Sequence, residues 1–155
     1  MPNAPTPAPG VRPPVAPRRQ GGVQYVEDFF AYTLVFSAMA PGDVDQQSIQ
    51  IQADSHFKWT KATFQADIAA DAYLDGTRPI PLISLQITDS GSGRQLFFNP
   101  LPVETIFGTG QLPFILPIPR IFMARSTIQV VASNFDAAVT YNLRLAFIGT
   151  KIFDM

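Results

Sequence analysis

Hydrophobic and polar residues alternate in the C-terminal third of the chain with the period of a β-strand. Ile128 and Val130 share one face of residues 127–131, and one face of residues 139–147 carries Val139, Tyr141, Leu143, Leu145 and Phe147. Successive side chains leave opposite faces of a strand, so each segment predicts one buried face and one polar face. Because residues 133–137 contain Asn and Asp, which favour turns, we expect the two strands to form an antiparallel hairpin.

Two further alternating segments predict strands near the N-terminus. In residues 29–38 one face carries Phe30, Tyr32, Leu34 and Phe36. The opposite face of this segment also holds apolar groups, which fits a strand that is buried on both sides or at an interface. Residues 47–52 alternate with Ile49 and Ile51 inward.

The apolar positions of residues 56–68 change parity within the segment. They are odd at first and then even, at Phe57, Trp59, Phe64, Ala66 and Ile68. A register change of one residue is what a β-bulge produces, and we place this bulge near Lys61.

Glycine and proline divide much of the remaining chain into short strands. Residues 82–88 and 94–99 flank the sequence Asp-Ser-Gly-Ser-Gly at 89–93, which predicts a hairpin. Residues 100–112 are then a long connection. Residues 113–123 contain three prolines, so they can pair only at a sheet edge or between bulges.

About eight strands at this spacing predict an all-β fold, a two-sheet antiparallel sandwich of jelly-roll type with little helix. Residues 23–155 form this domain, which at a chain length of 155 residues has a substantial core. Residues 1–22 form a separate extended proline-rich arm. Seven of the 15 prolines fall in the first 20 residues, and proline supports neither a strand ladder nor a helix.

The composition favours association with other proteins. Only 15% of the residues are charged, 13 are Phe and the formal net charge is −1, which leaves much uncharged surface. Without a basic patch, no direct nucleic-acid partner is expected. The chain has no cysteine, so disulfides and thiolate chemistry are excluded. We expect neither a membrane span nor Sec export, because long apolar runs are absent and the N-terminus MPNAPTPAPG is polar.

No residue pattern marks a catalytic centre, and we expect the protein not to be an enzyme. The only histidine, His56, has no nucleophile signature beside it and is favoured as a structural residue at the start of a strand. The glycine-rich segment at Asp89 lacks the lysine and the helix of a phosphate loop. Both glutamates, Glu27 and Glu104, lie near loops, which disfavours a glycosidase pair.

Metal and ligand sites are likewise disfavoured. The aspartates between residues 67 and 76 do not form a calcium loop, because Tyr73 and Leu82 occupy positions that need oxygen ligands. We therefore expect no metal, no cofactor and no small-molecule substrate. One binding alternative stays open, a jelly-roll carbohydrate-binding module that uses Trp59, Tyr73 or Phe107, although Trp59 is favoured as a core residue.

The arm carries the candidate partner-binding residues, which are Val11, Arg12, Pro14, Val15, Pro17, Arg18 and Arg19. Prolines lower the entropy cost of ordering a segment, so we expect the arm to act as a strap across a neighbouring subunit. Arg18 and Arg19 can pair with acidic groups there. Residues 14–19 also match the P-x-x-P-x-R form of an SH3 ligand, and a disordered tail is the remaining alternative.

The arm, the Phe-rich sandwich and residues 119–153, PRIFMARSTIQVVASNFDAAVTYNLRLAFIGTKIF, resemble those of small virion proteins of tailed bacteriophages. The resemblance is greatest to the jelly-roll cement (decoration) proteins on the outside of icosahedral heads. It implies a structural protein of the capsid exterior, made in the host cytoplasm, that clamps subunits of the major capsid protein. It also implies association with copies of itself as a dimer or trimer. A phage tail, fibre or head–tail adaptor protein is the alternative within this class.

Overall fold

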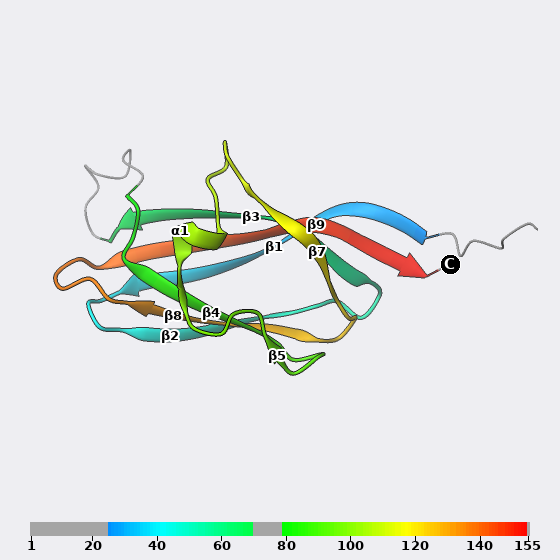
Figure 1. Cartoon of the computed structure of the whole chain (residues 1–155), viewed down its shortest axis with the longest axis horizontal. Coiled ribbons are helices and arrows are strands. Elements are labelled where there is room, and N and C mark those ends of the chain that lie inside the picture. Colours follow the sequence, from blue (N-terminus) through cyan, green and yellow to red (C-terminus); the bar gives the residue numbers. More distant parts are fainter. Residues whose placement is uncertain (1–24, 70–78, 155) are drawn as a thin grey trace, which may run out of the picture.

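The computed structural model describes residues 25–69 and 79–154, and most of these lie in β-strands (Figure 1). In chain order the strands are β1 (Tyr25–Met39), β2 (Val44–Gln50), β3 (His56–Ile68), β4 (Ile83–Asp89), β5 (Arg94–Gln95), β6 (Leu101–Pro102), β7 (Phe114–Phe122), β8 (Thr127–Asn134) and β9 (Tyr141–Asp154). Among the described residues the only helix is the four-residue α1 (Val103–Ile106). The predicted all-β class with little helix is confirmed.

The strands form two antiparallel sheets that pack face to face as a β-sandwich (Figure 1). Sheet A has the strand order β1-β9-β3-β7, and sheet B has the order β2-β8-β4-β5, with β6 also paired to β4. The chain passes from one sheet to the other at most of its connections. Strands that are neighbours in sequence therefore lie mostly in opposite sheets.

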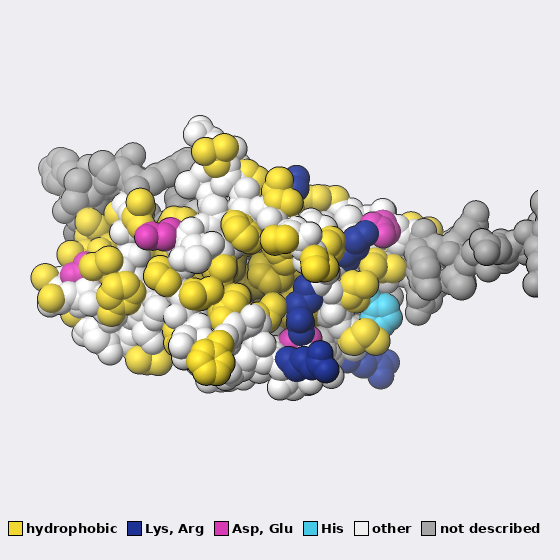
Figure 2. Space-filling model, viewed as in Figure 1, with side chains coloured by type: hydrophobic (Ala, Val, Ile, Leu, Met, Phe, Trp, Pro, Cys, Tyr) yellow, Lys and Arg dark blue, Asp and Glu magenta, His cyan; other side chains and the backbone are white. Residues whose placement is uncertain are grey.

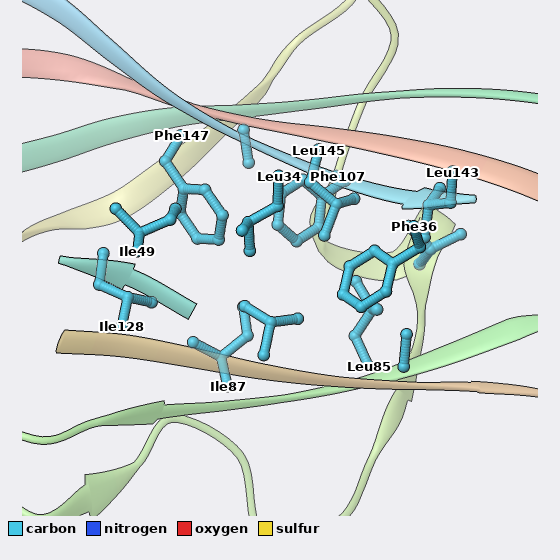
Figure 3. Packing of buried hydrophobic residues seen from close by; sticks show 14 of the residues in the cluster. Leu34, Phe36, Ile49, Leu85, Ile87, Phe107, Ile128, Leu143, Leu145 and Phe147 are labelled. Carbon is cyan, nitrogen blue, oxygen red and sulfur yellow. The ribbon is translucent and has the colours of Figure 1, made fainter. Parts of the chain in front are cut away.

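The core lies between the sheets, and the alternating apolar positions predicted from the sequence point into it (Figure 3). Sheet A contributes residues such as Leu34 and Phe147, which face Ile87 and Ile128 from sheet B. Each of these side chains is at least 94% removed from solvent, because the largest exposed fraction among them is 6%, at Leu34. Ile49 and Ile51 are buried as predicted.

The predicted hairpin between the last two strands is wrong. β8 pairs with β2 and β4 in sheet B, whereas β9 pairs with β1 and β3 in sheet A. The turn formers between them build a crossover instead. The amide of Asn134 donates to the carbonyl oxygens of Met39 and Val139, both at 2.9 Å, and its oxygen accepts from the backbone N–H of Asp136. These bonds carry the chain from one sheet to the other.

Strand β1 lies at the edge of sheet A, and among the described residues only one of its faces is buried, contrary to the expectation of burial on both faces. Its inward positions Leu34 and Phe36 are buried. On the other face, Phe29 is 77% exposed and Val35 is 48% exposed. The alternative, that this strand lies at an interface, stays a prediction.

The predicted bulge in β3 is confirmed. The register of β3 against β9 shifts between Trp59 and Lys61, which makes Thr60 the extra residue. Buried positions change parity across the shift, at Phe57, Trp59, Ala62 and Ala66. The bulge brings the two backbones together at Gly149, where a Cβ would lie 1.9 Å from the carbonyl oxygen of Lys58.

The hairpin at residues 89–93 is confirmed as the β4–β5 connection, although β5 has only two residues. The long connection after it contains β6 and α1, and it buries Val103 and Phe107. The proline-rich strand β7 lies at the edge of sheet A, and its register against β3 is interrupted, as its prolines predict.

Candidate interaction surface

Two of the residues considered for catalysis or metal binding, His56 and Asp67, lie in strand β3. His56 is the first residue of β3, and its Nδ1 accepts a hydrogen bond of 2.9 Å from the backbone N–H of Ala124. This bond ties β3 to the connection between β7 and β8 and supports the structural interpretation. Asp67 lies in β3 opposite Asn142 of β9. No group of three or more His, Asp or Glu side chains that could hold a metal ion occurs in residues 25–69 and 79–154.

Two of the three aromatic residues considered for carbohydrate binding belong to the core. Trp59 is 3% exposed and Phe107 is 1% exposed. Their rings pack together with that of Phe147, at centroid distances between 4.9 and 6.3 Å. Neither ring is available to stack on a sugar. The third candidate, Tyr73, lies outside the described residues, as do the arm residues 11–19.

An apolar groove lies between the edge strand β7 and the β4–β5 hairpin, with a volume of about 590 Å³. Figure 2 shows hydrophobic side chains gathered on this side of the molecule, with Lys and Arg side chains beside them. Three of the lining residues are well exposed, Ile118 at 81%, Met123 at 54% and Ile121 at 52%. We call this feature the β7 groove. Its apolar lining consists of Leu96, Leu116, Ile118, Pro119, Ile121 and Met123.

The local sequence of β7 explains why the groove is open. The strand pairs with β3 at residues 114–115 and again at residues 120–122, and residues 116–119 are left out of the paired register. Pro117 and Pro119 have no N–H to donate to a ladder, so this segment cannot add a further strand by regular pairing. This edge therefore presents side chains, and not a regular row of backbone hydrogen-bond donors, for contact.

An ion pair forms the polar part of the groove. Nη2 of Arg120 donates to Oδ2 of Asp89 at 2.9 Å and to Oγ of Ser92 at 3.1 Å. Burial raises the pKa of the Asp89 carboxyl, but hydrogen bonds from Arg120, Ser92 and the N–H of Gly91 together outweigh it, and the pKa is lowered. Asp89 therefore stays ionised, and it holds the hairpin against β7.

A second hollow, of about 360 Å³, lies on the outer face of sheet A. Ala146 of β9 is paired with Thr33 of β1 on one side and with Thr63 of β3 on the other. The short side chains of these residues leave a depression in the sheet surface. Gly110, in the connection before β7, also lines the hollow. The outer face of sheet A thus offers a shallow, weakly charged surface next to the β1 edge.

The β7 groove is not apparent from the amino-acid sequence. Its residues come from β7 and from the β4–β5 hairpin, which are distant in sequence and meet only in the folded sandwich. A usable signal was present in residues 115–123, where Ile118 and Ile121 occur in a proline-rich edge segment that contains one charge, Arg120. Large apolar residues in a strand that cannot be central indicate an apolar edge.

No protein-family model, no curated protein and no solved structure matches the chain. Among the described residues, no helix is long and apolar enough to cross a membrane.

Proposed function

We propose that the chain is a structural protein of a virus particle, which works as a cement protein by binding neighbouring subunits of the shell. The observation that carries this proposal is the β7 groove. Monomeric proteins rarely expose large contiguous apolar patches, and exposed patches with polar rims are typical of protein–protein contacts. Here the exposed apolar residues Ile118, Ile121 and Met123 line the same groove as the ion pair of Asp89 and Arg120.

We further propose that the sandwich is a jelly roll. Its strand order supports this, since β1 lies beside β9 in one sheet and β2 lies beside β8 in the other. Early and late strands are thus interleaved, as they are when two Greek keys form a double sheet. Jelly rolls occur in viral capsid domains as well as in lectins. The burial of Trp59 and Phe107 favours the first of these two uses.

The arm adds a second contact in the proposed role. A shell presents the same binding surface many times, so a weak contact at the β7 groove and another at residues 11–19 act together through high effective concentration. Arg18 and Arg19 pair with acidic groups of the neighbouring subunit, and the prolines limit the entropy lost on ordering. Neither contact needs to be strong alone.

A retention assay on virus particles tests the groove. Particles made from the genome that encodes the chain are purified on a density gradient, with the full chain supplied as wild type or as Ile118→Glu. We expect a fixed ratio of wild-type chain to shell protein, and at least about tenfold less of the variant, because a charge in an apolar contact is costly to desolvate. Absence of the wild-type chain from particles contradicts the proposal.

Phe135→Glu is the matched control for this assay. Phe135 is 55% exposed, but it lies in the β8–β9 connection and does not line the groove. We expect this variant to be retained like the wild type. Equal loss of both variants means that general surface hydrophobicity, and not the groove, governs retention.

Deletion of residues 1–22 tests the arm separately. We expect the truncated chain to keep the far-UV circular dichroism of the wild type, because the described sandwich begins at Tyr25. Its retention on particles is expected to be lost. Undiminished retention of the truncated chain contradicts the strap.

A further inference from the structure

The four strand edges of the sandwich are not equally protected against pairing with another chain. An unprotected edge offers a row of free N–H and C=O groups, and natural proteins block such edges with prolines, short strands, bulges or inward-pointing charges. In sheet B, β5 has only two residues, and β2 carries Asp45 on the same side of the strand as the buried Ile49. In sheet A, β7 has prolines at 117 and 119 and an interrupted register.

Strand β1 is the exception. It has 15 residues, and no described strand pairs with its side opposite β9. Its charges, Glu27 and Asp28, lie near one end, and residues 29–39 contain neither a charge nor a proline. The one irregularity is a register shift between Phe36 and Met39, at the other end. The middle of β1 therefore has none of the usual protection.

We propose that β1 pairs antiparallel with β1 of a second copy of the chain, about a two-fold axis at Tyr32. The two copies of sheet A then form one continuous sheet of eight strands. In this register Phe29 of each copy lies opposite Val35 of the other, and Ala31 lies opposite Thr33. An aromatic residue opposite a β-branched one is a favourable cross-strand pair.

The exposed residues of β1 match this arrangement. Phe29 and Val35 are both on the outer face of sheet A and are the most exposed large hydrophobic residues among the described side chains of the strand, at 77% and 48%. Because of the two-fold axis, the contact between Phe29 of one copy and Val35 of the other occurs twice. This is the self-complementarity that an isologous dimer requires. Glu27 comes to lie opposite Ser37, so no like charges meet.

A second copy fits this edge better than the arm does. Strand addition depends on main-chain hydrogen bonds. Seven of the first 20 residues are prolines, which cannot donate such bonds. Strand β1 contains no proline, so each N–H group on its free side can donate to a second copy. The edge and the arm therefore suit different partners.

The biological purpose of the dimer rests on the proposed function, because a dimer presents two β7 grooves to a shell and gains avidity. The measurement of the dimer does not depend on the proposed function. Self-association of the purified chain is separate from retention on particles, so failure of one leaves the other intact. A dimer that is absent from particles refutes the virion role alone, and a retained monomer refutes the dimer alone.

Sedimentation equilibrium of the full chain tests the inference by comparing the wild type with two variants that differ only in the sign of the charge at residue 29. We expect a species of twice the 17.0 kDa chain mass that dissociates on dilution. The double variant Phe29→Lys/Val35→Lys places like charges opposite each other at both ends of the contact, and we expect its self-association to be about tenfold weaker or worse. Phe29→Glu/Val35→Lys places opposite charges there and is expected to restore the dimer.

The two charge variants are matched controls for each other, because they alter the same two exposed positions. Residues 29 and 35 are about 20 Å apart along one strand, at about 3.3 Å per residue, so their charges interact little within a copy. A wild-type chain that stays monomeric at every concentration overturns the proposal. Equal behaviour of the two variants also overturns it.

Cysteine cross-linking tests the register independently of these charges. The natural chain has no cysteine, so engineered thiols have no competing partners. We expect Ala31→Cys/Thr33→Cys to give a covalent dimer under mild oxidation, because each residue 31 lies opposite residue 33 of the other copy. The single variants Ala31→Cys and Thr33→Cys are expected to stay uncross-linked. Cross-linking of the single variants, or no cross-linking of the double variant, refutes this register.

Discussion

Asn134 holds the crossover between the two sheets, and replacing it should destabilise the whole sandwich. The residue is 2% exposed. Its amide nitrogen donates two hydrogen bonds of 2.9 Å, to the carbonyl oxygens of Met39 and Val139, and its oxygen accepts one from the N–H of Asp136. The residue thus joins the end of β1, the end of β8 and the entry into β9.

The cost of Asn134→Ala follows from the groups that lose their partners. A buried polar group without a hydrogen bond costs about 1–3 kcal/mol. The bond to Met39 is buried and that to Val139 is partly buried, so water can satisfy the second carbonyl more easily. We expect a loss of about 2–4 kcal/mol in the free energy of unfolding. Asn134→Asp is expected to cost at least as much, because it turns a carboxylate oxygen towards two carbonyl oxygens.

Urea unfolding measures this cost, with the fluorescence of the only tryptophan, the buried Trp59, as the probe. Asn142→Ala is the matched control. Its side-chain oxygen accepts one hydrogen bond, from the N–H of Ala38, and this bond is exposed to solvent. We expect the control to cost less than about 1 kcal/mol. If Asn134→Ala falls within about 0.5 kcal/mol of the wild type, or if both variants cost the same, the crossover does not depend on Asn134.

Two further predictions concern the β3 bulge and the ion pair. Gly149→Ala should cost about 3 kcal/mol or prevent folding, since its Cβ would meet the carbonyl oxygen of Lys58 at 1.9 Å, whereas Gly110→Ala, with no atom within 4 Å, should be nearly neutral in urea unfolding. The pKa of Asp89 is lowered in the folded state by Arg120, among other hydrogen-bond donors, although burial opposes them. Its contribution to stability is therefore complete above the unfolded pKa of about 3.9 and is lost as the pH falls through the folded pKa. Asp89→Asn should remove this part of the loss of unfolding free energy at acid pH. If the free energy of unfolding of the variant falls with decreasing pH as in the wild type, the prediction is wrong.

The burial faces were predictable from the sequence because a strand converts alternation directly into two faces. Ile128, Val130, Leu143 and Leu145 are all buried as their parity indicates. The same local rule predicted the bulge near Lys61, since one inserted residue reverses the parity. The prolines likewise place β7 at an edge.

The pairing partners were not predictable in the same way. Alternation says which side of a strand is buried, but the sheet to which the strand belongs depends on long-range pairing. Residues 133–137 have the composition of a hairpin turn, yet Asn134 and Asp136 direct the chain into the opposite sheet. A local pattern cannot distinguish these outcomes, because turns and crossovers use the same residue types.

The candidate surface was even less accessible from the sequence. The nominated arm residues lie outside the described residues, and the β7 groove brings together two distant segments. Burial of Trp59 removes it as a ligand site and confirms it as a core residue. The sequence does show apolar residues on both faces of β1, which predicts burial on two sides or an interface. The structure leaves Phe29 and Val35 on the outer face of β1 exposed.

A density map of the purified virus particle tests the central claim most directly. We predict sandwich-shaped density on the outside of the shell at symmetry-related positions, bridging neighbouring shell subunits with the β7 groove against the shell. Density for residues 11–19 should extend across an adjacent subunit. A particle that lacks this density, while the chain is abundant and free in the same infected cells, contradicts the claim.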